Sequence, residues 1–249
     1  MRLNLFLARA AGGSRREAEG WVREDRVRIN GAPPRGFGDP IDPAHDRVTL
    51  DGRVVRLPAT PRWIAYHKPP GYLVSRRGQG GKPTIYDQLA GRAEGLHPVG
   101  RLDYESEGLL LLTDDGTLAE ALLHPRSEFR REYRVWVAPV PDPSRLRRFA
   151  AGAVVEGTRV VPEEIELEGA ERGLGILRVV LLEGKKREIR VLAKGAGLDV
   201  RRLLRIAFGP VRLGVLRRGA IRALESRELA ALRRLAVPRG ARLSPRRSR

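Results

Sequence analysis

The chain has 249 residues, a length that suits one large domain or two unequal ones. Its 48 lysines and arginines outnumber its 30 aspartates and glutamates, and the formal charge of +18 predicts a polyanionic partner, above all nucleic acid. The chain has no cysteine, which excludes disulfides, thiolate catalysis and cysteine-bound zinc or iron–sulfur centres. Because it also lacks a signal-like start and an apolar run of about 18 residues, we expect a cytoplasmic protein without membrane contact.

Residues 1–57 are predicted to form a small unit that begins with two helices. Apolar residues three and four apart predict the first helix, at Leu3, Phe6, Leu7 and Ala10. Gly12 and Gly13 end this helix, and Ser14 with Glu17 predicts a capping box at the start of the second helix.

Strands and tight turns follow the two helices. Residues 26–31 alternate basic and apolar side chains and end in Asn-Gly, which predicts a strand followed by a turn. Asp51-Gly52 predicts a hairpin between strands at 48–50 and 54–57. The first unit is therefore predicted to be a small α/β domain.

Two arginines, Arg15 and Arg16, stand in the first turn of the second predicted helix. Cations are unfavourable at a helix N-terminus, whereas a phosphate there is stabilised by free backbone N–H groups. We therefore predict that Arg15 and Arg16 contact RNA, the alternative being two solvated side chains. Arg28, on the following strand, is a further candidate for RNA contact.

Residues 58–61, Pro-Ala-Thr-Pro, are predicted to be a linker, and residues 62–236 a larger second domain. Strand-like patterns recur through this domain, at 63–66, 109–112, 131–137, 176–182 and 204–208, with a helix at 189–196. Because strands and helices do not alternate regularly, a mixed α+β domain is predicted rather than a doubly wound one. Residues 237–249 are basic and lack an apolar period, which predicts a disordered tail.

Asp103 is the carboxylate that stands apart from the mixed-charge surface stretches. It follows Gly100-Arg101-Leu102 and precedes Gly108 and the apolar residues 109–112. A carboxylate at the edge of a core is unfavourable unless it is paired, so the position indicates either a turn or cap aspartate or a functional acid. The four histidines, at 45, 67, 97 and 124, are too scattered to predict a metal site.

Two parts of the chain resemble known families. SRREAEGWVREDRVRINGAPP, at 14–34, resembles the S4 RNA-binding domain, with Asp25-Arg26 where that family usually has glycine. HPVGRLDYESEGLLLLTDDGTLAEALLHP, at 97–125, resembles the catalytic segment of the RsuA/RluB family of pseudouridine synthases. Further resemblances to that family lie in YHKPPGYLVS at 66–75, REYRV at 131–135, EGKKREIRVL at 183–192 and the closing segment 201–224.

The resemblance implies an isomerase that cleaves the glycosidic bond of a uridine in RNA, turns the base and rejoins it through carbon. Asp103 maps onto the family's essential aspartate, Tyr133 onto the tyrosine of its second motif and Arg190 onto the basic residue of its third. Without the resemblance, Tyr133 would be interpreted as strand packing and Arg190 as a solvated charge. With it, Arg190 is expected to lie beside Asp103 and keep that carboxyl ionised.

The resemblance also implies the fold, the partner and the contacts with RNA. It predicts an S4-like unit followed by a mixed, mainly antiparallel catalytic domain, acting as a monomer on ribosomal RNA, with the large subunit as the expected target. RNA contacts are predicted at four further residues, namely Lys68, Arg101, Lys185 and Lys186. Because the reaction involves no redox change, we expect neither a cofactor nor a metal.

Two alternatives from other classes stay open at this point. One is a non-catalytic RNA-binding protein that uses its S4-like unit in ribosome assembly. The other is a hydrolase that uses the same carboxylate but releases free uracil to water. The sequence also leaves open whether Asp103 attacks the sugar or removes a sugar proton.

Overall fold

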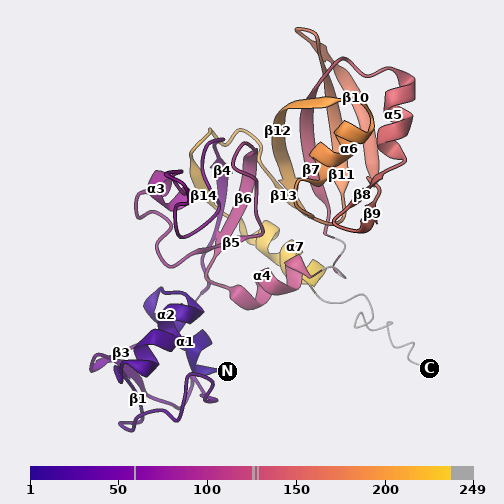
Figure 1. Ribbon diagram of the computed structural model, residues 1–249. Helices are drawn as coiled ribbons and strands as arrows, with labels where there is room; N and C mark the ends of the chain where they lie inside the picture. The colour runs from indigo at the N-terminus through magenta and orange to yellow at the C-terminus, as the bar shows by residue number, and fades with distance from the viewer. Residues whose placement is uncertain (59, 125–126, 128, 237–249) are drawn as a thin grey trace, which may run out of the picture. The chain divides into compact units, whose positions relative to one another are not determined.

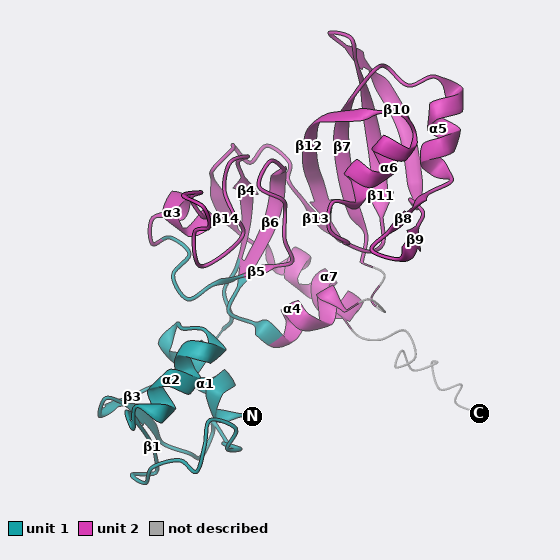
Figure 2. Ribbon diagram, in the orientation of Figure 1, with its two compact units in different colours: residues 1–63, 92–97, 113–116 teal, residues 64–91, 98–112, 117–249 magenta. Residues whose placement is uncertain are grey.

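The computed structural model describes the whole chain except residues 59, 125–126, 128 and 237–249 (Figure 1). The predicted tail, 237–249, lies outside the described residues. The chain divides into two compact units (Figure 2): the first comprises 1–63, 92–97 and 113–116, and the second the rest. None of the described helices is long and apolar enough to cross a membrane.

The first unit packs two helices on a small antiparallel sheet. Helices α1 (Leu3–Ala11) and α2 (Arg15–Arg23) precede strands in the order β1 (Val27–Ile29), β2 (Val48–Leu50) and β3 (Arg53–Val54). Apolar side chains from both layers form its core, among them Leu3, Phe6, Leu7, Ala18, Val27, Ile41 and Val48.

The predicted helix end, capping box and hairpin turn of this unit are confirmed, whereas the strands predicted at 26–31 and 54–57 are shorter, at 27–29 and 53–54. Gly12 ends α1 in the left-handed conformation, with φ of 78°. Ser14 and Glu17 form both hydrogen bonds of the capping box on α2. Asp51 and Gly52 both have positive φ, 51° and 76°, and connect β2 to β3.

A nine-stranded mixed sheet dominates the second unit (Figure 1). Its main path runs β10 (Glu164–Glu171), β11 (Leu174–Leu181), β7 (Arg131–Ala138), β12 (Asp199–Phe208), β6 (Glu107–Thr113), β4 (Trp63–Lys68) and β14 (Ile221–Ala223). Two strands lie off this path: β5 (His97–Val99) pairs with β6, and β13 (Val211–Arg212) pairs with β12. The β12–β6 pair is parallel, whereas β10–β11, β11–β7, β7–β12 and β4–β14 are antiparallel.

Helices and a small hairpin accompany this sheet. They are α3 (Ile85–Leu89), α4 (Gly116–Leu123), α5 (Pro143–Ala150), α6 (Glu188–Gly195), α7 (Ser226–Ala236) and the hairpin of β8 (Ala153–Val155) with β9 (Thr158–Val160). Helix α6 packs against β12, β8 and α5 (Figure 1). The predicted mixed, mainly antiparallel α+β class is thus confirmed.

Burial alternates along both β7 and β12, but on β12 the buried set is not the one that the apolar residues 204 and 206 suggest. On β7, every second side chain from Arg131 to Val137 is buried, as expected. On β12, Leu204 and Ile206 alternate with Arg205 and Ala207 in the sequence, yet these two apolar side chains are only half-buried and Arg205 is buried. Backbone carbonyls accept hydrogen bonds from two of the three guanidinium nitrogens of Arg205, Nε and Nη1, which lowers the cost of burying this charge.

Candidate active site

Asp103 lies on a loop that joins β5 to β6, and the buried side chain of Lys68 is hydrogen-bonded to that loop. The Lys68 amino group donates to the carbonyl oxygens of Asp103 at 3.2 Å, Tyr104 at 3.3 Å and Ser106 at 2.8 Å. It also donates to Pro69 at 2.9 Å, and its side chain is 0% exposed. The predicted RNA contact by Lys68 is therefore wrong, because the amino group is enclosed and already hydrogen-bonded.

Burial lowers the pKa of Lys68 to about 8, and the nearby carboxylates of Asp103 and Glu107 oppose this shift. Glu107 is itself buried and pairs with Arg202 and Arg218. Charged groups therefore pack against the Asp103 loop. Apolar side chains in their place would leave the loop's carbonyl oxygens without hydrogen-bond donors.

Arg205, on β12, is a second buried cation under the same loop. The residue is 2% exposed, and its guanidinium donates to the carbonyls of Leu109 at 2.7 Å and Arg101 at 3.4 Å. These two carbonyls flank the loop on either side of Asp103. The sequence analysis missed Arg205, and the only available signal was an arginine inside an otherwise apolar strand pattern.

Gly108 explains how β6 approaches β12 so closely. The parallel register sets Gly108 opposite Arg205, and Gly108 has φ of 111°. A Cβ atom added there would lie 2.6 Å from the Arg205 backbone nitrogen and closer still to its carbonyl oxygen. The strand after the Asp103 loop therefore requires glycine at this position.

Tyr133 completes a row of residues across three neighbouring strands. The antiparallel β7–β12 register pairs Tyr133 with Arg205, which in turn faces Gly108. Tyr133 is 6% exposed, and burial raises the pKa of its hydroxyl, while the charges of Arg205 and Arg131 oppose that rise. Tyr133 and the loop of Asp103 thus share one buried cation.

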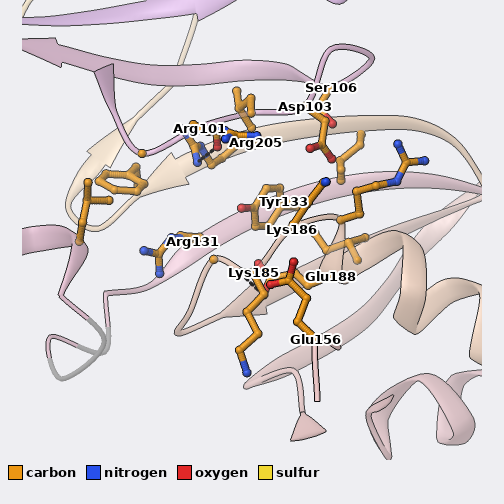
Figure 3. Close-up of a pocket in the computed structure, with 18 residues that line it drawn as sticks. Arg101, Asp103, Ser106, Arg131, Tyr133, Glu156, Lys185, Lys186, Glu188 and Arg205 are labelled. Carbon is orange, nitrogen blue, oxygen red and sulfur yellow. Dashed lines mark hydrogen bonds between the residues drawn. The ribbon is translucent and has the colours of Figure 1, made fainter. Parts of the chain in front are cut away.

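Asp103, Tyr133 and Arg205 all line an open cavity of about 440 Å³ (Figure 3). Basic side chains outnumber acidic ones around it: Arg101, Arg131, Lys185, Lys186, Arg187 and Arg205 against Asp103, Glu156 and Glu188. Within the described residues, the Asp103 carboxylate makes no hydrogen bond or ion pair. It is therefore free to act on a ligand in a cationic setting.

Arg190 does not occupy the predicted place. Its guanidinium pairs with Glu105 at 3.4 Å and donates to the carbonyl of Val200 at 3.4 Å. Among the described residues, no ion pair joins Arg190 to Asp103, so the predicted pairing is wrong. The helical repeat supplies the reason, since residues two apart on α6 point about 200° apart and Glu188 is the one that lines the cavity.

Glu188 is a buried acid that the sequence analysis also missed. It is 4% exposed and accepts a hydrogen bond from the Lys185 backbone N–H at 3.0 Å, which closes the turn before α6. Burial raises its pKa to about 7, against the opposing effects of that hydrogen bond and of Arg131. The same turn carries the predicted RNA contacts: Lys186 is exposed, and Lys185 pairs with Glu183 at 3.2 Å.

The candidate RNA contacts of the first unit differ in their surroundings. Arg15 and Arg16 are exposed and, among the described residues, form no ion pair. Arg28 instead donates to both carboxylate oxygens of Asp25, at 2.8 and 2.9 Å. Because Asp25 has φ of 54°, this pairing supports the strained turn where the resemblance to the S4 family implied glycine. The Arg28 guanidinium is thus already paired within the protein.

Two family models match parts of the chain. A family model described as RNA pseudouridylate synthase matches residues 62–194, and an S4 domain model matches residues 1–33. The chain belongs to the RNA pseudouridylate synthase family. The predicted enzyme class, a pseudouridine synthase with an N-terminal S4 domain, is therefore confirmed.

Relatives and a solved structure cover most of the chain. An uncharacterized RNA pseudouridine synthase of Aquifex aeolicus is 38% identical over 233 residues, 93% of each chain. The ribosomal large subunit pseudouridine synthase B of Pseudomonas aeruginosa is 37% identical over 238 residues, 93% of this chain and 61% of that protein. A crystal structure of a pseudouridylate synthase aligns with a TM-score of 0.64 and 26% identity, covering 93% of this chain and 99% of its own.

Proposed function

We propose that the protein converts a specific uridine of large-subunit ribosomal RNA to pseudouridine. The observation that carries the proposal is the unpaired Asp103 carboxylate in a cavity lined mainly by basic side chains. The choice of RNA rests on relatives such as that of Pseudomonas aeruginosa, which is named for the ribosomal large subunit.

The target nucleotide is expected to enter the cavity in a flipped conformation. A uridine inside a stacked helix hides its glycosidic bond, so the base must leave the stack before chemistry begins. A volume of about 440 Å³ lies within the range of sites for small ligands, about 300–1,000 Å³. Tyr133 then stacks on the base, and the exposed Arg101 fills the gap that the base leaves in the RNA.

Asp103 acts on the ribose of this nucleotide, and two routes start from its ionised form. It attacks the anomeric carbon as a nucleophile, or it removes a sugar proton as a base. The basic side chains around the cavity attract the phosphates that flank the target nucleotide in either case. Uracil leaves through N1, turns and rejoins the sugar through C5, and no electrons enter or leave.

Both the first unit and the residues around the cavity are proposed to contribute to RNA binding. Arg15 and Arg16 face solvent at the start of α2, where a phosphate also meets free backbone N–H groups. Lys186 extends the basic surface at the cavity. In this division of labour residues 1–57 bind RNA and residues 62–236 carry out the reaction, with 58–61 as the linker.

The test is nucleotide-resolution mapping of pseudouridine in ribosomal RNA after treatment with the wild type or with Asp103→Asn. The variant keeps the side-chain shape, so we expect isomerisation to vanish while RNA affinity changes by less than about tenfold. Glu105→Gln is a matched control, since it removes one charge from the same loop outside the cavity. Release of free uracil would indicate a hydrolase, and binding without conversion by the wild type would indicate an assembly factor.

A further inference from the structure

A glycine-rich loop, residues 75–83, lies between β4 and α3 (Figure 1). Its sequence, SRRGQGGKP, contains three cations and no acid, and every residue in it is exposed. The loop therefore adds positive charge to the surface of the second unit, at a place that the proposed function does not yet use.

Hydrogen bonds give the glycine-rich loop a defined shape. At its base, the Leu73 N–H donates to the Pro83 carbonyl at 2.8 Å, and the Ile85 N–H donates to the Leu73 carbonyl at 2.9 Å. At its tip, Gly80 and Gly81 both have positive φ, 59° and 71°, as in a tight hairpin turn. No described atom lies within 4 Å of the place that a Cβ would take at either glycine, so a ligand's backbone can approach the tip closely.

The glycine-rich loop contacts the loop that carries Asp103. The Lys82 ammonium group lies 4.7 Å from the centre of the Tyr104 ring, a cation–π contact. Just before the glycine-rich loop, the Gly71 N–H donates to the Tyr104 carbonyl at 2.7 Å. Because Tyr104 directly follows Asp103, the Lys82 cation lies beside the catalytic loop.

Two cations of the glycine-rich loop lack an anionic partner. In the part of the chain that the structure describes, the side chains of Arg77 and Lys82 form neither a hydrogen bond nor an ion pair. The acid nearest in sequence to Tyr104, Glu105, is already paired with Arg190 at 3.4 Å. The charges of Arg77 and Lys82 are therefore available to an anion from outside the chain.

The opposite face of the nine-stranded sheet shows a different pattern. Glu132 alternates with Tyr133 on β7, so it points away from the cavity. It pairs with Arg178 at 2.7 Å and also with Arg212, and Arg178 pairs with Glu164 at 2.9 Å. The charges on this face neutralise one another, whereas those on the glycine-rich loop do not.

We propose that the glycine-rich loop binds backbone phosphates of the substrate RNA next to the target uridine, through Arg77 and Lys82. This inference rests on the proposed function, because it concerns the RNA that brings a uridine to Asp103. Both cations are exposed, so neither encloses a small anion. Exposed cations bind a chain of phosphates well, because each contact releases counterions condensed on the nucleic acid.

The first test measures affinity for an rRNA fragment at several salt concentrations, together with single-turnover rates. The double variant Arg77→Gln with Lys82→Gln should weaken affinity between about threefold and twentyfold, the effect of losing two exposed ion pairs. The slope of log affinity against log salt should fall by about 0.7–0.9 for each lost contact. The maximal rate should change by less than about threefold, because neither side chain lines the described cavity. Unchanged affinity and slope, or a large loss of maximal rate at unchanged affinity, would overturn the proposal.

Two control variants separate this role from net charge and from misfolding. Arg172→Gln removes an exposed cation from the turn between β10 and β11, and β10 and β4 lie toward opposite ends of the strand order. Its RNA affinity should match that of the wild type, and a loss as large as that of the loop variants would show that only net charge matters. Lys82→Arg keeps the charge and should stay within about twofold of the wild type.

The second test removes the charge of one phosphate at a time, by placing a neutral methylphosphonate linkage at each position around the uridine. At a phosphate that Lys82 binds, the neutral linkage should weaken binding by the wild type about two- to fivefold. It should have almost no effect on Lys82→Gln, so the two losses should not add. If the losses add at every linkage, Lys82 binds no phosphate and the proposal is wrong. Absence of pseudouridine with the wild type would instead refute the proposed function, and the affinity measurements test the loop in either case because they need no conversion.

Discussion

Replacing Gly108 by alanine should damage the fold where the Asp103 loop joins the parallel pair of β6 and β12. The added Cβ would lie 2.6 Å from the Arg205 backbone nitrogen, and β12 cannot retreat because β7 pairs with its other edge. A φ of 111° costs a non-glycine residue about 1–3 kcal/mol, and overpacking costs about 1–3 kcal/mol more. The sum, about 2–6 kcal/mol, is a large part of a typical domain stability of about 5–15 kcal/mol.

The assay is equilibrium unfolding in urea, read by circular dichroism, for Gly108→Ala and a matched control. Gly116→Ala adds the same methyl group at the start of α4, where no heavy atom lies within 4 Å of the new Cβ. We expect its stability to stay within about 1 kcal/mol of the wild type. If Gly108→Ala also unfolds within about 0.5 kcal/mol of the wild type, the close approach of β6 to β12 described above is wrong.

Three further predictions concern charged groups. The folded-state pKa of Glu188, about 7, lies above its ordinary value of 4.5, so stability should fall by about 3 kcal/mol as pH rises between these values. Glu188→Gln should abolish that fall in urea titrations at several pH values, and an unchanged slope would contradict the assignment. Lys68→Met leaves the carbonyls of the Asp103 loop without donors, so hydrogen exchange at 103–106 should accelerate and the unfolding midpoint should drop; full protection there would refute the support role. Arg15→Ala with Arg16→Ala should reduce the slope of log RNA affinity against log salt by about 0.7–0.9 per lost phosphate contact, and an unaltered slope would remove both from the RNA interface.

Local sequence patterns were sufficient for several features that depend on neighbouring residues. The capping box at Ser14 and Glu17 needs residues only three apart, and the Asp51-Gly52 turn needs two adjacent residues that tolerate positive φ. The period of two on β7 likewise predicted which of its side chains are buried. The resemblance around Asp103 added the enzyme class, because a long motif specifies a family even where its geometry is unknown.

The environment of Asp103 was decided by tertiary structure. Arg205 lies 104 positions from Arg101, to whose carbonyl it donates, and Lys68 lies 35 positions from Asp103. These contacts depend on the strand order β7–β12–β6–β4, which no local period encodes. The same order leaves Arg190 beside Glu105 and brings Glu188 to the cavity. From the sequence, a charged residue is predicted to be exposed to solvent, because burying a charge is unfavourable. Only the folded chain brings the distant carbonyls to Lys68 and Arg205 that make their burial stable.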